Sequence, residues 1–142
     1  MSELPPRDLD SIRAEIDRVD SDLILLLNRR VLLAQEIGTL KGADGKPFFT
    51  PERERQIFER LTALNQGPLR TDQLHGIFRE VISAARAAER LLRIAFWGPK
   101  GTFSHLAALK TFGSNVQLEA KESIRDVFMA VEHQQADYGI VP

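Results

Sequence analysis

One arginine interrupts a regular series of apolar residues in the first third of the chain. The apolar residues recur in steps of three and four, and the slot between Leu26 and Leu33 that should continue the series holds Arg30. Such a series predicts a helix whose apolar side is buried against another helix. Burying a guanidinium without a partner is strongly unfavourable. Arg30 therefore predicts either a buried ion pair or an anion-binding site inside a helical core. The series comprises Leu9, Ile12, Ile16, Val19, Leu23, Leu26, Leu33, Ile37 and Leu40.

Two further cations lie at informative distances from Arg30 on the same predicted helix. Lys41 follows Arg30 by eleven residues, which places the two within ~20° around the helix and ~16 Å apart along it. Their long side chains could hold the two ends of a small molecule. Arg13 lies ~25 Å from Arg30 and ~100° around the helix. It would reach the same ligand only from the partner chain of an antiparallel dimer.

Two more charges fall on inward faces of later predicted helices. Arg53 precedes the apolar Ile57 by one turn, and Glu89 fills a skipped slot in an apolar series that ends at Leu92. Arg30 and Glu89 are compatible with a purely structural ion pair, and each of the other charges, taken singly, is compatible with a solvated edge position. Several inward cations against one or two carboxylates nevertheless leave excess positive charge. This excess favours a multiply charged anionic ligand.

The elements that position these residues are three predicted helices. The first covers residues 8–41, the second begins at Pro51 after Thr50 as N-cap, and the third begins near Thr71 and carries the pattern to Leu92. The first helix would be ~50 Å long. The second and third are too short to cover its apolar side. We therefore expect an interlocked homodimer through the long helix.

From residue 93 the pattern changes to a short α/β unit. Strands are expected at residues 93–97, 116–120 and 137–141, and helices at 102–112 and 123–134. This βαβαβ order is typical of a parallel sheet. The last strand has no helix after it, so we expect a truncated unit.

Composition limits the remaining function classes. The chain has 142 residues, a formal net charge of −1 and no cysteine, which disfavours a nucleic-acid binder and excludes thiolate metal sites. We find neither a secretion signal nor an apolar run long enough to span a membrane. These features predict a cytoplasmic protein without nucleic-acid or membrane partners.

Five short motifs, taken together, resemble the all-helical class of chorismate mutases. They are residues 12–20 (IRAEIDRVD), 27–30 (LNRR), Lys41, 51–55 (PERER) and 78–86 (FREVISAAR). The stretches 98–105 (GPKGTFSH) and 135–142 (QADYGIVP) resemble the opening of a prephenate dehydratase domain. The resemblance implies an all-α three-helix mutase domain (residues 1–92) and an incomplete dehydratase-like α/β fragment (residues 93–142).

The resemblance also implies a reaction and roles for the charged residues. Chorismate mutases convert chorismate to prephenate by an intramolecular [3,3] rearrangement that needs no metal, cofactor or nucleophile, so catalysis depends on conformation and electrostatics. Arg30 and the partner's Arg13 would bind the substrate carboxylates. Lys41 would donate to one carboxylate and to the ether oxygen. Arg53 would help to hold the site, and Glu54 would accept from the ring hydroxyl.

Three positions depart from the family pattern. Glu89 stands where many relatives have glutamine, and a carboxyl group can donate to the ether oxygen only when it is protonated. Ala85 replaces a serine, and Thr50 replaces an aspartate, found in some members. The rival interpretation is therefore a non-catalytic dimerisation or regulatory module with a degenerate pocket.

The α/β fragment gives weaker signals. Residues 98–104 predict either an anion cradle at a helix N-terminus or simply a tight strand–helix connection. His105 and His133 are expected at the surface or in helix packing. The family's later threonine-arginine-phenylalanine segment does not occur, so we expect no dehydratase activity.

Overall fold

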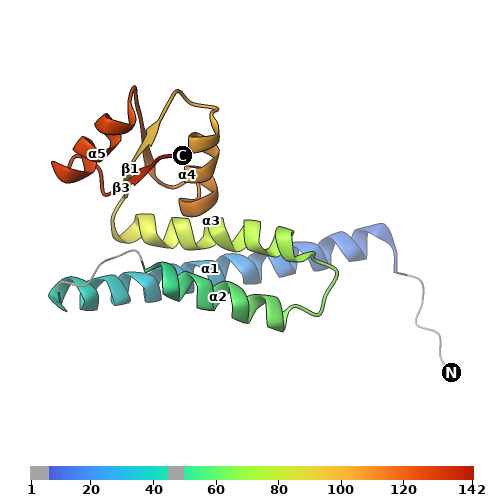
Figure 1. The fold of residues 1–142 in the computed structure, drawn as a ribbon. Coiled ribbons are helices and arrows are strands. Elements are labelled where there is room, and N and C mark those ends of the chain that lie inside the picture. Colours follow the sequence, from blue (N-terminus) through green and yellow to red (C-terminus); the bar gives the residue numbers. More distant parts are fainter. Residues whose placement is uncertain (1–6, 45–49) are drawn as a thin grey trace.

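Among the described residues, three helices come first, and a small sheet with two helices follows (Figure 1). The computed structural model describes residues 7–44 and 50–142. The order of elements confirms the expected three helices followed by βαβαβ. The elements are α1 (Leu9–Asp44), α2 (Pro51–Leu64), α3 (Thr71–Glu89), β1 (Arg93–Trp97), α4 (Phe103–Phe112), β2 (Gln117–Lys121), α5 (Ile124–Glu132) and β3 (Tyr138–Ile140).

Helix α1 is the longest element, and its N-terminal part projects beyond α2 and α3 (Figure 1). Its 36 residues correspond to ~54 Å. The helix continues to Asp44 instead of ending near Lys41, because Gly42 inside a helix carries only a modest penalty.

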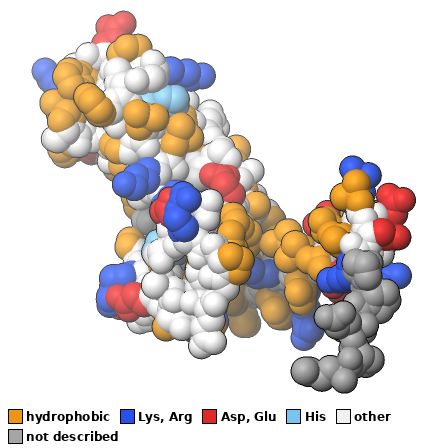
Figure 2. Space-filling model, turned by 90° about the vertical axis from the view of Figure 1, so that its right-hand side faces the viewer, with side chains coloured by type: hydrophobic (Ala, Val, Ile, Leu, Met, Phe, Trp, Pro, Cys, Tyr) orange, Lys and Arg blue, Asp and Glu red, His pale blue; other side chains and the backbone are white. Residues whose placement is uncertain are grey.

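The apolar series of α1 is exposed in the single chain. The short second and third helices were expected to leave part of it uncovered, and every member of the series stays exposed. Its members keep between 40% and 68% of their surface exposed. The face of α1 that packs on the other helices is formed by Val31, Ala34 and Gly38. Each of these residues follows a position of the apolar series by one. Hydrophobic side chains consequently gather on the open surface between the helical bundle and the N-terminal end (Figure 2).

Helix α3 ends at Glu89, three residues before the end of its apolar pattern. Arg90 adopts an extended conformation, with φ −160° and ψ 131°, and leads the chain into β1. Leu92, expected to belong to the helical core, instead lies 2% exposed in the core under the sheet. The backbone carbonyl of Leu92 accepts a hydrogen bond from Gln117 N at 2.8 Å, and this bond fixes it at the entry to the sheet.

The sheet is parallel, with the strand order β2-β1-β3. Ile94 of the central strand is paired with Leu118 on one side and Tyr138 on the other. Helix α4 covers one face, where Ile94, Ala108 and Phe112 pack with Leu92, and α5 covers the other. The observed strands differ from the expected ones by one residue at most of their ends.

Helix α4 also packs on α3, so the sheet part rests on the helical part (Figure 1). In the part of the chain that the structure describes, no helix is both long enough and apolar enough to cross a membrane.

Candidate active site

Most of the charged residues singled out in the sequence surround one cavity of about 120 Å³ where α1, α2 and α3 meet. Four cations and two carboxylates contribute to it, so positive charge is in excess. The lining residues are Arg30, Ala34 and Lys41 from α1, Thr50 at the start of α2, Arg53, Glu54 and Ile57 from α2, and Ile82, Ala85, Arg86 and Glu89 from α3. The structure thus brings together every expected site residue except Arg13.

Arg13 lies on the projecting part of α1, away from this cavity. Its side chain is 67% exposed and lies 3.9 Å from Asp10 of its own helix. The expectation that Arg13 cannot reach the site of its own chain therefore agrees with the structure.

Arg30 lies half-buried at the edge of the cavity, beside other cations. Burial lowers the pKa of its guanidinium, and the nearby charges of Arg53 and Arg60 lower it further, while Glu54 acts in the opposite direction. The cationic form of Arg30 is therefore only partly compensated by the protein. An anionic ligand in the cavity would supply the missing negative charge.

Glu54 is held by an arginine that the sequence analysis did not assign to the site. Arg86 donates from Nη2 to Glu54 Oε1 at 2.7 Å, and the two side chains are only 8% and 19% exposed. Burial raises the pKa of Glu54, although the charges of Arg86 and Arg30 oppose the rise. The available signal for Arg86 was its spacing, four residues after the buried Ile82 on the inward face of α3.

Lys41 is held by Thr50 across the α1–α2 junction. Lys41 Nζ donates to Thr50 Oγ1 at 3.2 Å. Thr50 occupies the N-cap position of α2 as expected, but its side chain makes no capping hydrogen bond. Its hydroxyl group instead orients the lysine ammonium at the cavity.

Glu89 and Ala85 close the cavity on the α3 side. Ala85 is 2% exposed and contributes no polar group. The carboxyl group of Glu89 packs against Gly38, where an added Cβ would lie 2.6 Å from Glu89 Oε2, so a larger residue at this point of α1 would displace the Glu89 side chain. Burial raises the pKa of Glu89, opposed by the charges of Lys41 and Arg86. The raised pKa extends the protonated form, which is the form able to donate a hydrogen bond, to higher pH than in an ordinary glutamate.

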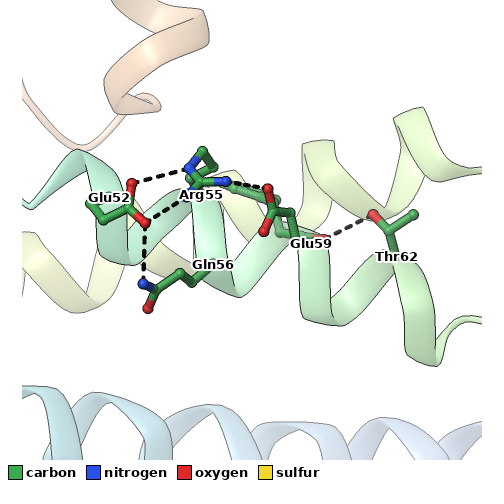
Figure 3. A network of polar contacts seen from close by, with 6 residues as sticks. Glu52, Arg55, Gln56, Glu59 and Thr62 are labelled. Carbon is green, nitrogen blue, oxygen red and sulfur yellow. Dashed lines mark hydrogen bonds and ion pairs between the residues drawn. The ribbon is translucent and has the colours of Figure 1, made fainter.

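The outer face of α2 carries a different set of charges, which neutralise one another. Arg55 bonds to Glu52 at 2.6 and 3.1 Å and to Glu59 at 2.5 Å, and Gln56 joins the same network (Figure 3). Such a face offers no excess of cations to a phosphate backbone. It therefore argues against the nucleic-acid interpretation.

Residues of the segment 98–104, for which the sequence left open an anion cradle or a tight strand–helix connection, line a larger and mainly apolar hollow of about 520 Å³ together with Trp97 and Ile140. The Gly101 amide donates to His105 Nδ1 at 2.9 Å, and the His105 ring stacks on Phe96 with 5.2 Å between ring centroids. His105 thus has the packing role that was expected, and His133 is exposed at the end of α5. Within residues 7–44 and 50–142, no cluster of His, Asp or Glu is arranged to hold a metal ion.

Comparison with known proteins gives two matching families. The chorismate mutase type II profile matches residues 12–90, and the prephenate dehydratase profile matches residues 94–142. The bifunctional chorismate mutase/prephenate dehydratase of Aquifex aeolicus is 44% identical over 139 residues, covering 95% of this chain and 38% of that protein. The protein of the same name from Escherichia coli K12 is 32% identical and covers 93% of this chain and 39% of that protein. The chain therefore spans less than half the length of these relatives.

The similarity extends to solved structures. The chorismate mutase (form II) of Thermus thermophilus aligns with 36% identity and a TM-score of 0.56, over 57% of this chain and 92% of that one.

Proposed function

Because the chain belongs to the chorismate mutase type II family, we propose that the cavity between α1, α2 and α3 binds chorismate and converts it to prephenate. The observation that carries this proposal is the excess of cations around one half-buried cavity. Chorismate carries two carboxylates, and its ether oxygen gains negative charge as the C–O bond breaks. A rigid set of cations would therefore bind the substrate and also stabilise the transition state.

In this proposal each side chain has a defined task. Arg30 binds a substrate carboxylate. Lys41, oriented by Thr50, donates to a carboxylate and to the ether oxygen. Arg53 adds positive charge near the mouth of the cavity, and Glu54 accepts from the ring hydroxyl.

Glu89 is proposed as the second donor to the ether oxygen, in its protonated form. Its half-buried position against Gly38 and its raised pKa support this assignment. Ala85 only fills space, so the substrate loses there the hydroxyl contact that a serine would make.

We further propose that the active unit is an antiparallel homodimer through α1. The exposed apolar series supports this arrangement, since a surface of this extent is unfavourable in water. A two-fold axis near Ser21 and Asp22, midway between Arg13 and Arg30, would place the partner's Arg13 beside Arg30. The second chain would then supply a cation that the single chain lacks.

The division into a mutase domain (residues 1–92) and a dehydratase-like fragment (residues 93–142) is part of the same proposal. So is the absence of dehydratase activity from these 142 residues, a prediction that a prephenate decarboxylation assay would check. The cytoplasmic location stays a prediction.

The test is the loss of chorismate absorbance with the purified chain. The Arg30→Ala variant should lose activity by about a hundredfold or more, the cost of removing one preorganised charged donor. The matched control is Arg55→Ala, since Arg55 lies in the exposed network on the outer face of α2. This control should keep full activity. A folded dimer without turnover would refute the proposal and favour the dimerisation or regulatory module.

A further inference from the structure

Arg86 lies between the mutase cavity and the core of the sheet part. On one side its guanidinium forms the 2.7 Å ion pair with Glu54. On the other side its Cζ lies over the ring of Phe112, 5.9 Å from the centroid. Phe112 is the last residue of α4 and packs with Ile94 in the core under the sheet. One buried side chain therefore contacts both parts of the chain.

The loop that follows Phe112 is fixed to the same face of α3. The Ser114 hydroxyl donates to Glu80 Oε2 at 2.5 Å, and the backbone N–H of Asn115 donates to Ser83 Oγ at 3.1 Å. Gly113 lies so close to α3 that an added Cβ would be 2.5 Å from Ser83 Cβ. These contacts occur one and two turns before Arg86 on α3, so they hold the Phe112 ring at a fixed height on that helix.

We propose that Phe112 is a positioning residue for the mutase cavity, and that it acts by holding the Arg86 guanidinium against Glu54. A planar guanidinium stacks well on an aromatic face, and the contact restricts the many rotamers of a free arginine. With Arg86 fixed, the Glu54 carboxylate is held at the cavity wall for the substrate hydroxyl. The sheet part thereby sets the affinity of the helical part for its ligand. The identity of this ligand as chorismate rests on the proposed function.

The kinetic test compares two equivalent core substitutions. Phe112→Leu removes the ring under Arg86, whereas Phe96→Leu makes the same change at a fully buried position of β1 that faces His105. Phe112→Leu should raise the KM for chorismate about three- to tenfold, as expected for a partly desolvated cation–π contact, with kcat nearly unchanged. Phe96→Leu should leave KM at the wild-type value. Equal changes in KM for the two variants would overturn the proposal, because a general loosening of the sheet core would explain them.

A second measurement does not depend on catalysis. The carboxyl carbon of Glu54 can be titrated by 13C NMR in the wild type and in both variants. Arg86 and Arg30 are the charged groups that lower the pKa of Glu54, so loosening Arg86 in Phe112→Leu should raise this pKa. The Phe96→Leu variant should titrate as the wild type does.

The two readouts separate the possible failures. An unchanged Glu54 titration in folded Phe112→Leu would refute the positioning role, whatever the activity. A wild-type chain without turnover would refute the proposed function, while the titration would still decide whether Phe112 positions Arg86.

Discussion

Two arginines of the helical part form ion pairs of similar length in very different surroundings. Replacing each by methionine should show whether burial or pair distance determines how much an ion pair contributes to the free energy of unfolding. Arg86 is 2.7 Å from Glu54, with side chains 8% and 19% exposed. Arg55 is 2.6 Å from Glu52 and 2.5 Å from Glu59, with all three side chains about 60% exposed. Methionine retains most of the arginine's apolar stem in both variants.

The expected losses of unfolding free energy depend on how far solvent reaches each ion pair. Arg86→Met leaves the Glu54 carboxylate buried near Arg30 alone, and removal of one partner of a buried pair costs about 3 kcal/mol of unfolding free energy. Arg55→Met should cause no measurable change, because water and salt screen the exposed network.

The assay is urea denaturation followed by circular dichroism, at one fixed protein concentration because the proposed dimerisation would contribute to stability. A loss of about 3 kcal/mol would lower the urea midpoint by about 1.5 M. The result that would refute this reasoning is a midpoint for Arg86→Met equal to or above that of Arg55→Met.

The same pair has a predictable pH dependence. The pKa of Glu54 is already raised by burial in the folded chain, so its contribution to stability is complete at acid pH and is lost as pH rises through the raised value. Arg86→Met should raise this pKa further. The loss of stability of Arg86→Met relative to the wild type should therefore be smaller at pH values below the ordinary pKa of glutamate and larger toward neutral pH.

Three further outcomes are expected. Because burial raises the pKa of Glu89 and only the protonated acid donates, kcat/KM should fall as pH rises above the ordinary glutamate range, and Glu89→Gln should flatten this profile; a sloping profile in the variant would remove Glu89 from the mechanism. Gly113→Ala should lower stability by more than about 2 kcal/mol, since φ is +75° and the new Cβ would meet Ser83. Its control, Gly101→Ala, has φ +90° but open space and should cost about 1 kcal/mol; equal losses in thermal unfolding would contradict the contact with Ser83. Leu23→Glu should convert a dimer into monomers in sedimentation equilibrium and abolish turnover, and an active monomer would refute the shared site.

The sequence was sufficient to predict the elements and most of the cavity. Periodicity and turn residues indicated each of the eight elements in the described part of the chain, because capping and hydrophobic spacing act locally. Thr50 and Pro51 marked the start of α2, and the βαβαβ order predicted a parallel sheet. Arg30 and Glu89 were found because a charge in an apolar slot needs a compensating partner or ligand.

Only the tertiary structure showed which face of α1 is buried and which residues the site shares with the sheet part. The series through Arg30 and the face through Gly38 differ by one residue, and helical spacing alone does not reveal which of the two meets α3. Leu92 was predicted in the helical core but lies in the sheet core, because the chain leaves α3 and enters β1 at Arg90. Arg86 remained unassigned because its contacts, Glu54 and Phe112, lie on two other elements. Local sequence determines secondary structure through nearby backbone and side-chain interactions, whereas the pairing of distant side chains depends on how the helices and the sheet pack.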